Sequence, residues 1–461
     1  MTLYEDVAER IQDMVDAGTL RAGQKIPSVR GLHKDLGVSI STVLEAYRLL
    51  EDRGIVEVRP QSGHYVKASA RPPEPKHQGP GPGFDQNDLM VRITMRAGRE
   101  GLVGLGCGLP DATMLPLKQL DRLMARVARE RKDRHDYVMA PGHLRLRRAL
   151  AKRLIAAGCT LGPEDVVITT GCQEALDLCF RTVCSPGDRV GVPSPAYFGL
   201  LEILRAQGLE AVEIPTHPRD GMDLDALEEA LGDLYAVAVE ANHANPLGTR
   251  MSDAAKKRLV EMCSRAGVPL IEDDAYGDLG FDGTRPRSLK AWDRGGIVLS
   301  CGTLSKTLSP GLRVGWVTGG RFTAELARRK MVTSLACATI PQLTATEFLE
   351  SGGYDRHLRR LRRVYRDNLR RVGVAVAEAF PFGTGITRPK GGQFLWVQVP
   401  GLDALDLFER AWDEGISIAP GPMFSASAGH RDCIRLNASV QWSEELGGAI
   451  ARLGELVRAS G

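Results

Sequence analysis

The stretch that decides the fold of the N-terminal part is Pro27–Gly54, PSVRGLHKDLGVSISTVLEAYRLLEDRG. Ser28 can cap a helix that runs to about Leu36, because a serine oxygen accepts a free backbone N–H of the first turn. Gly37 then supplies the left-handed conformation that ends a helix. Another helix begins near Ser39. Its apolar residues recur at helical spacing, at Val43, Tyr47 and Leu50.

The sequence on either side of this stretch completes a small module. Residues 3–17 carry apolar side chains at helical spacing, which predicts an amphipathic first helix. Short strands are expected at 55–59 and 64–67, around the Pro-Gln-Ser-Gly turn at 60–63. A helix, a helix-turn-helix and a hairpin, in this order, are typical of a mainly α winged helix-turn-helix.

These residues resemble the GntR family of transcription regulators, through Pro27–Gly54 and the wing sequence VRPQSGHYV at 58–66. The resemblance implies that the helix beginning near Ser39 enters the major groove of double-stranded operator DNA. Short hydroxyl groups at the start of that helix can reach phosphates or base edges, and a glycine lets the wing approach the minor groove. The expected DNA-binding residues are Arg30, Ser39, Ser41, Thr42, Arg48 and Gly63.

The module is not basic overall, since residues 1–67 hold nine Lys or Arg against ten Asp or Glu. DNA binding must therefore come from a one-sided arrangement of cations. The cations available for it are Arg30, Lys34, Arg48, Arg59 and Lys67. A winged helix used only for protein contacts is the other interpretation of this pattern.

A Pro- and Gly-rich segment, ARPPEPKHQGPGPG at 70–83, separates this module from the rest of the 461-residue chain. Its composition favours a semi-extended linker. We expect a DNA-binding domain at 1–69, a linker at 70–87 and a body at 88–461.

The N-terminus is polar, no apolar run reaches the roughly 18–20 residues that span a bilayer, and the nine cysteines form no CxxC pair. These features predict a cytoplasmic protein without a metal or a membrane partner, associated with the nucleoid when bound to DNA.

The body alternates strand-like apolar runs with amphipathic helices, which predicts an α/β domain with a mainly parallel sheet. The runs lie at 166–169, 189–192, 236–239, 269–272 and 297–300. Ligands of such sheets bind at the carboxyl ends of the strands. Residues that could take part in chemistry cluster directly after these runs.

The most informative of these residues is Lys306, in SCGTLSKTLSPGLRVGW at 300–316. A lysine that follows a strand and has hydroxyl neighbours can form a Schiff base with an aldehyde cofactor. Arg313 can clamp a phosphate with its planar fork. At 271–276, IEDDAY ends a strand with carboxylates and a phenol. A carboxylate that faces a pyridine nitrogen keeps it protonated, which makes the ring an electron sink.

Four further segments supply the remaining groups of such a site. The strand-to-helix turn TTGCQEA at 169–175 suits a phosphate, because backbone N–H groups point out of a helix start. Asn245 offers an amide for a ring oxygen, and Tyr197 offers a ring for stacking. Arg435 can bind the carboxylate of a substrate.

In this order, the segments resemble fold-type I aminotransferases over roughly residues 88–459. The resemblance implies a body with a smaller C-terminal α/β domain and bound pyridoxal 5'-phosphate. Lys306 would be the Schiff-base lysine, Asp273 would pair with the ring nitrogen, and Arg435 would bind an amino-acid carboxylate. Asp273 is chosen over Asp274 because it stands three residues before the tyrosine. The other implied cofactor contacts are Tyr276 and Asn245 at the ring hydroxyl, Tyr197 against the ring, Gly171, Cys172, Gln173, Ser305 and Arg313 at the phosphate, and Tyr137 reaching the phosphate of the neighbouring subunit. A fold that has lost its cofactor is the other interpretation.

A GntR-type module fused to an aminotransferase-like body resembles the MocR subfamily. The resemblance implies a homodimeric transcription regulator whose body senses pyridoxal phosphate itself, or a small amine or amino acid that reacts with it. A working aminotransferase that uses an amino acid and a 2-oxo acid stays open, as does a protein that does both.

Two arginine-rich stretches, at 122–134 and 356–370, could extend a DNA footprint across the body. We favour the simpler interpretation, in which each is a solvated helix face.

Overall fold

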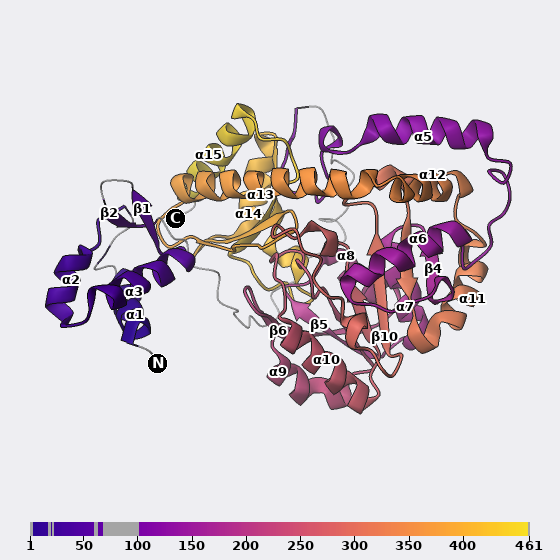
Figure 1. Ribbon diagram of the computed structural model, residues 1–461, viewed down its shortest axis with the longest axis horizontal. Coiled ribbons are helices and arrows are strands. Elements are labelled where there is room, and N and C mark those ends of the chain that lie inside the picture. Colours follow the sequence, from indigo (N-terminus) through magenta and orange to yellow (C-terminus); the bar gives the residue numbers. More distant parts are fainter. Residues whose placement is uncertain (1–2, 17–19, 21–22, 60–62, 68–100, 460–461) are drawn as a thin grey trace. The chain divides into compact units, whose positions relative to one another are not determined.

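The computed structural model describes residues 3–16, 20, 23–59, 63–67 and 101–459. The chain divides into two compact units, Met1–Arg71 and Pro72–Gly461. The expected linker at 70–87 and the beginning of the expected body, 88–100, lie outside the described residues. Each unit is treated by itself below (Figure 1).

The N-terminal unit is the winged helix-turn-helix that the sequence predicts. Its elements are α1 (Leu3–Asp16), α2 (Val29–Leu36), α3 (Ile40–Asp52), β1 (Val56–Arg59) and β2 (Gly63–Val66). Ser28 and Ser39 cap α2 and α3 by accepting the N–H groups of Gly31 and Thr42, each at 3.1 Å. Gly37 ends α2 in the left-handed conformation, with φ of +66°. The two caps fix the turn of the helix-turn-helix.

Tyr47 anchors α3 in the core of this unit. Its side chain is buried, and its hydroxyl donates to the carbonyl of Pro27 at 2.6 Å. Burial raises the pKa of Tyr47 to about 12, so the phenol stays protonated and keeps this bond. The ring also packs edge-on against His64 of β2, with 4.8 Å between ring centroids. Tyr47 thus ties α3 both to the start of α2 and to the wing.

The large domain of the body is built on an eight-stranded sheet in the order β4-β11-β10-β9-β8-β5-β6-β7. Strands β4, β10, β9, β8, β5 and β6 run in one direction, and β11 and β7 run against them. The strands are β4 (Val166–Thr169), β5 (Arg189–Ser194), β6 (Glu210–His217), β7 (Gly221–Met222), β8 (Ala236–Val239), β9 (Leu270–Asp273), β10 (Val298–Thr303) and β11 (Gly315–Thr318). The mainly parallel sheet expected from the sequence is confirmed.

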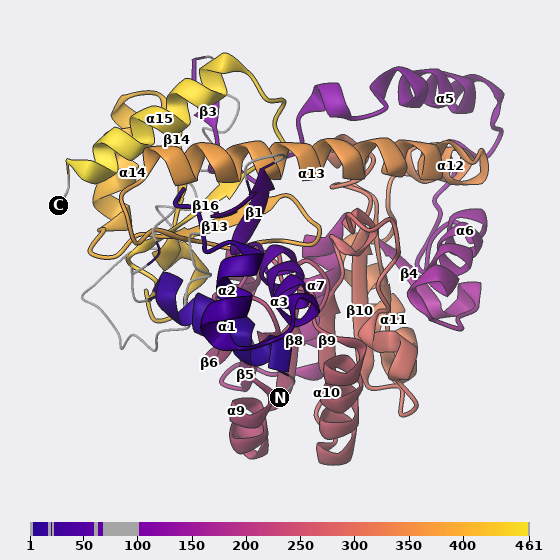
Figure 2. The same ribbon diagram turned by 60° about the vertical axis from the view of Figure 1, so that its left-hand side comes forward.

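Helices cover both faces of this sheet (Figures 1 and 2). Alternate residues of β8 show why: Ala236 and Ala238 join the core under α7 and α8, whereas Val237 and Val239 join the core under α9 and α10. The helices of this domain are α5 (Leu117–Glu130), α6 (Leu144–Leu154), α7 (Cys172–Val183), α8 (Phe198–Ala206), α9 (Leu224–Ala230), α10 (Asp253–Ala266), α11 (Thr323–Ser334) and α12 (Thr339–Glu350).

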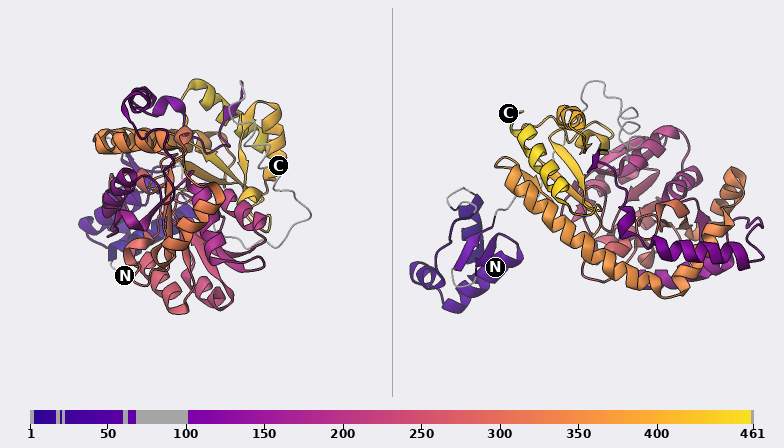
Figure 3. Two further views of the ribbon diagram at one scale, coloured as in Figure 1. Left: turned by 90° about the vertical axis from the view of Figure 1, so that its right-hand side faces the viewer. Right: turned by 90° about the horizontal axis from the view of Figure 1, so that it is seen from above.

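A smaller C-terminal α/β domain follows, as expected. Its four-stranded sheet has the order β12-β13-β16-β15, and a further strand, β14, pairs with β3 from the start of the body. The long helix α13 packs on α15 in this domain and reaches α12 at its other end, as Figure 3 shows. The elements are β3 (Val103–Gly104), α13 (Gly353–Ala379), β12 (Gly385–Ile386), β13 (Phe394–Gln398), α14 (Ala404–Asp413), β14 (Ile416–Ser417), β15 (Ala419–Pro420), β16 (Cys433–Asn437) and α15 (Glu444–Arg458).

The two arginine-rich stretches lie largely on helix surfaces of the body. On α13, the exposed arginines of the stretch 356–370 are Arg356, Arg359, Arg360, Arg363, Arg366 and Arg370. In the other stretch, Arg126 pairs with Glu347 on α12, and Arg131 pairs with Asp133 at 2.8 Å. No helix in the described part of the chain is long and apolar enough to cross a membrane. Nor do its described His, Cys, Asp and Glu side chains gather into a metal-binding group.

Candidate functional site

A cavity of about 340 Å³ opens at the carboxyl ends of the parallel strands of the large domain. Loops after β4, β5, β8, β9 and β10 supply most of its wall, and the rest comes from β16 of the smaller domain and the segment 107–109 after β3. Ten of the residues expected from the sequence line it: Cys172, Gln173, Tyr197, Asn245, Asp273, Tyr276, Ser305, Lys306, Arg313 and Arg435. Residues that are far apart in the chain therefore meet at one edge of the sheet.

Lys306 lies in the first turn after β10 and points into this cavity. Its Nζ donates to the carbonyl of Gly108 at 2.8 Å, across 198 residues of sequence. Burial lowers the pKa of Lys306, since a charged ammonium group is poorly solvated there. A lysine with a lowered pKa holds more of the neutral amine that attacks an aldehyde.

Asp273 ends β9 and is a buried carboxylate of the site. Its Oδ1 accepts the N–H of Ala275 at 3.1 Å and the thiol of Cys172 at 3.2 Å. Burial raises the pKa of Asp273 to about 6. A buried carboxylate of this kind suits a protonated pyridine nitrogen as its partner. Cys172, which was expected at the phosphate, contacts Asp273 with its side chain, so only its backbone remains for the phosphate.

Asp274, the neighbouring carboxylate, points elsewhere. It forms an ion pair with Arg285 and accepts a hydrogen bond from Asn242 at 3.0 Å. It does not line the cavity. This geometry supports the choice of Asp273 for the ring nitrogen.

An anion cradle lies at the start of α7. Gly171 has φ of +84°, and a Cβ there would stand 2.5 Å from Nη2 of Arg313. The Arg313 guanidinium donates to the carbonyl of Thr170 at 2.8 Å and approaches the Ser305 hydroxyl at 3.4 Å. No side chain caps α7, so its first backbone N–H groups are free for an anion. A guanidinium, a hydroxyl and a helix start together fit a phosphate.

Three aromatic residues line the cavity: Tyr197, Phe198 and Tyr276. The Tyr197 hydroxyl donates to Oε1 of Gln173 at 3.2 Å, and Nε2 of Gln173 donates to the carbonyl of Gly199 at 2.8 Å. The Gln173 side chain, expected at the phosphate, is therefore bonded to the Tyr197 hydroxyl instead. Tyr276 is buried edge-on against Phe394, with 5.5 Å between ring centroids.

Arg435 lies on β16 and is 1% exposed. Nη1 donates to Oδ1 of Asn245 at 3.0 Å, and Nη2 donates to the carbonyl of Gly106. The rings of Phe394 and Phe424 lie 4.3 and 5.0 Å from the guanidinium carbon. Nε is buried and has no hydrogen-bond partner among the described residues. A buried arginine with an unsatisfied donor suits a carboxylate ligand.

Several residues of the cavity were not expected from the sequence. They are Cys107, Gly108, Leu109, Leu176, Phe198, Gly199, Glu240, Ala275 and Thr303. The segment GLGCGLP at 104–110 offered a signal, since its glycines permit close backbone approach. Glu240 offered another, as an acid directly after an apolar strand. Tyr137, by contrast, is 79% exposed and does not line the cavity of its own chain.

In the N-terminal unit, the expected DNA-binding residues lie around the helix-turn-helix. Arg30 on α2 and Arg48 on α3 are exposed, and Arg48 pairs with Glu45 at 2.9 Å. Oγ of Ser39 lies 2.8 and 2.7 Å from the hydroxyls of Ser41 and Thr42.

Two findings refine the expected DNA contacts. The structure gives Gly63 a local role, because it has φ of +107° and a Cβ there would stand 3.0 Å from Lys25. Ile40 and Leu44, at the start of α3, are 44% and 42% exposed and offer apolar contacts beside these hydroxyls.

Comparison with known proteins matches two family models to the chain. Bacterial regulatory proteins of the gntR family match residues 3–66, and aminotransferase class I and II matches residues 100–453. The chain is 36% identical to the uncharacterized HTH-type transcriptional regulator YjiR of Escherichia coli, over 99% of each chain. It is 29% identical to the probable rhizopine catabolism regulatory protein MocR of Rhizobium meliloti, over 81% of this chain and 77% of that one. The solved structure of LysN, an alpha-aminoadipate aminotransferase of Thermus thermophilus, is 31% identical with a TM-score of 0.74, over 82% of this chain and 99% of the other.

Proposed function

Since the chain belongs to the GntR-type transcription regulators that carry an aminotransferase class I and II domain, the MocR type, we propose that its body senses pyridoxal phosphate, or an amine or amino acid that reacts with it. The winged helix-turn-helix binds DNA, and we propose that this binding responds to the state of the body. The observation that carries the proposal is the convergence of Lys306, Asp273 and Arg435 on one cavity.

Pyridoxal phosphate is the cofactor that this cavity fits. The Gly171 and Arg313 cradle leaves no room for a Cβ and presents donors to a phosphate, and Asp273 is a buried acid that forms no ion pair with a described residue. The LysN structure holds N-(5'-phosphopyridoxyl)-L-leucine, which supports the same assignment. When bound, the cofactor supplies an aldehyde carbon that combines reversibly with amines and a protonated ring that withdraws electrons.

The residues of the chain would divide the work as follows. Arg313, Ser305 and the start of α7 would bind the phosphate, and Asp273 would accept a hydrogen bond from the ring nitrogen. Lys306 would hold the aldehyde carbon and, once displaced by an incoming amine, would carry a proton at the substrate carbon. Arg435 would bind the carboxylate of an amino acid.

The sensor function requires unequal affinity of the ligand for two DNA-binding arrangements, because a ligand that binds both equally shifts nothing. The experiment is fluorescence anisotropy of a labelled duplex from the region upstream of the protein's own gene. Pyridoxal phosphate alone, and pyridoxal phosphate with each of a panel of amines and amino acids, are titrated. We expect at least one addition to change the Kd about tenfold or more, and Lys306→Ala to remove the change. A Kd that no addition alters would refute the sensor function.

A working aminotransferase is the second candidate, favoured by the lowered pKa of Lys306, which suits a group that moves protons. Turnover distinguishes the two. Conversion of one cofactor equivalent to its amine form without further cycles supports a sensor. Repeated cycles with an amino acid and a 2-oxo acid support an enzyme.

We also propose that the protein is a homodimer in the cytoplasm, bound to the nucleoid through its operator. The exposure of Tyr137 supports this, since the residue is free to reach a neighbouring subunit. Sedimentation velocity tests the assembly. Tyr137→Phe should weaken cofactor binding severalfold without changing the sedimentation coefficient, whereas unchanged cofactor affinity would contradict the role of Tyr137.

A further inference from the structure

Glu240 is a buried acid that the cofactor contacts do not explain. It follows β8 directly and is 8% exposed. No lysine or arginine of the described chain forms an ion pair with it, although buried carboxylates are usually paired. Its side chain lines the cofactor cavity and also a smaller cavity of about 20 Å³, which has room for about one water molecule.

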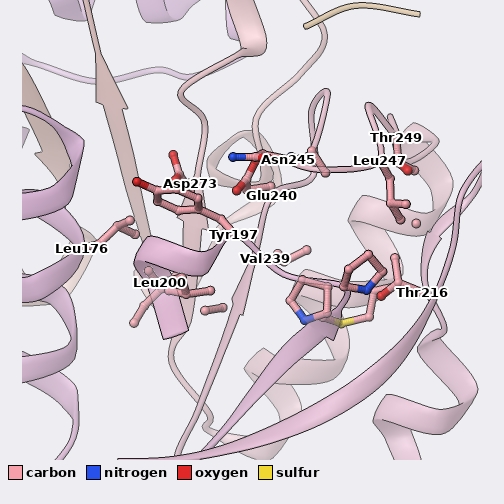
Figure 4. A pocket seen from close by; sticks show the side chains of 17 residues that line it. Leu176, Tyr197, Leu200, Thr216, Val239, Glu240, Asn245, Leu247, Thr249 and Asp273 are labelled. Atoms are coloured by element: carbon pink, nitrogen blue, oxygen red, sulfur yellow. The ribbon is translucent and has the colours of Figure 1, made fainter. Parts of the chain in front are cut away.

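The Glu240 side chain makes one hydrogen bond to a described residue, and that bond reaches the site. Its Oε2 accepts the backbone N–H of Asn245 at 2.7 Å, which closes the loop after β8. Oε1 makes no hydrogen bond to a described residue. Figure 4 shows Glu240 and Asn245 next to each other, with Asp273 and Tyr197 close by. The acid therefore fixes the peptide group from which the Asn245 side chain projects.

Asn245 passes this restraint on to the smaller domain. Its Oδ1 accepts from Nη1 of Arg435 at 3.0 Å, which leaves Nδ2 as the donor for a ring oxygen. Glu240, Asn245 and Arg435 thus form one hydrogen-bonded relay from β8 to β16 (the Glu240 relay). The relay joins the two places where the cofactor ring and a carboxylate would be bound.

We propose that Glu240 is a positioning residue that holds Asn245 in line with Arg435, so that the body distinguishes ligands that carry a carboxylate from simple amines. This inference rests on the proposed function, because it assigns a further positioning residue to the same site.

The relay needs an acceptor atom and not a negative charge. Burial and the nearby Asp273 raise the pKa of Glu240, while Lys306, Arg435 and its bond from Asn245 act in the opposite direction. A protonated acid still accepts the Asn245 N–H through its carbonyl oxygen. Glutamine keeps that oxygen, and methionine removes it at nearly the same size. The two variants therefore separate positioning from charge.

The experiment uses the full chain loaded with pyridoxal phosphate, with L-alanine and ethylamine as probes. Their apparent Kd values are read from the absorbance of the bound cofactor. We expect Glu240→Met to weaken the binding of L-alanine about tenfold or more and to leave that of ethylamine within about twofold, because the buried hydrogen bond from Asn245 that aligns Arg435 is lost. Glu240→Gln should stay within about twofold of the wild type for both probes.

A double-mutant cycle with Arg435→Leu gives a second measurement. Glu240→Met should not raise the apparent Kd for L-alanine any further when Arg435 is already leucine, because the relay then lacks the residue that would bind the carboxylate. Equal weakening of both probes in Glu240→Met, a glutamine variant as weak as the methionine variant, or additive deficits in the cycle would each overturn the inference. A wild type that responds to neither probe would overturn the proposed amine sensing as well, whereas a responding wild type that Glu240→Met matches would overturn the relay alone.

Discussion

Asp273→Asn should stabilise the cofactor-free body while it weakens the cofactor site. Asp273 is 8% exposed, and burial raises its pKa from an ordinary value near 3.8 to about 6. The difference corresponds to about 3 kcal/mol, at about 1.4 kcal/mol for each pKa unit. Asparagine has the same shape and can still accept the Ala275 N–H, so it removes this cost without opening a cavity.

The sign of the pH dependence follows from the raised pKa. Between about pH 4 and 6, the folded body holds a proton on Asp273 that the unfolded chain has released. The ionisation of Asp273 therefore costs nothing well below pH 4, roughly half of the full amount at pH 5, and the full amount of about 3 kcal/mol above about pH 7. The benefit of Asp273→Asn should grow in the same way as the pH rises.

The assay is calorimetry of the cofactor-free protein at pH 5 and pH 8. The unfolding entropy is about 2.1 cal/mol/K per residue, and the body, Pro72–Gly461, has about 390 residues. The expected increase in Tm is then about 4 °C at pH 8 and about 2 °C at pH 5. Asp121→Asn, at an exposed position of α5, is the matched control and should leave Tm unchanged. A lower Tm for Asp273→Asn at pH 8, or an equal gain at both pH values, would refute the reasoning.

Three further predictions concern other parts of the chain. Lys306→Ala should abolish the visible absorbance of the bound cofactor and its trapping by borohydride, and a band that survives would contradict the assignment of Lys306. Gly171→Ala should weaken pyridoxal phosphate at least tenfold in a fluorescence titration, because its Cβ would stand 2.5 Å from the Arg313 guanidinium; wild-type affinity would argue against the phosphate cradle. Ser39→Ala should lower the free energy of unfolding of the N-terminal unit by about 1 kcal/mol, because it removes the cap of α3. The urea unfolding transition followed by Tyr47 fluorescence should then move to lower urea concentration, and an unshifted transition would count against the cap.

Local signals in the sequence predicted the elements well. Ser28, Gly37 and Ser39 mark the ends of helices through hydrogen bonds within three or four residues, so they could be identified without knowledge of the rest of the chain. The apolar runs of the body likewise predicted strands β4, β5, β8, β9 and β10, because burial on both faces of a sheet leaves a continuous apolar pattern.

The sequence by itself determined the winged helix-turn-helix, the α/β class of the body and the strand ends from which the site is built. Only the tertiary structure decided which side chains meet there. Gly108 reaches Lys306 across 198 residues, Gln173 turns toward Tyr197, and Glu240 comes to hold Asn245 in line with Arg435. The physical reason is that strand order and the packing of the smaller domain set these contacts, and no local pattern of residues records either.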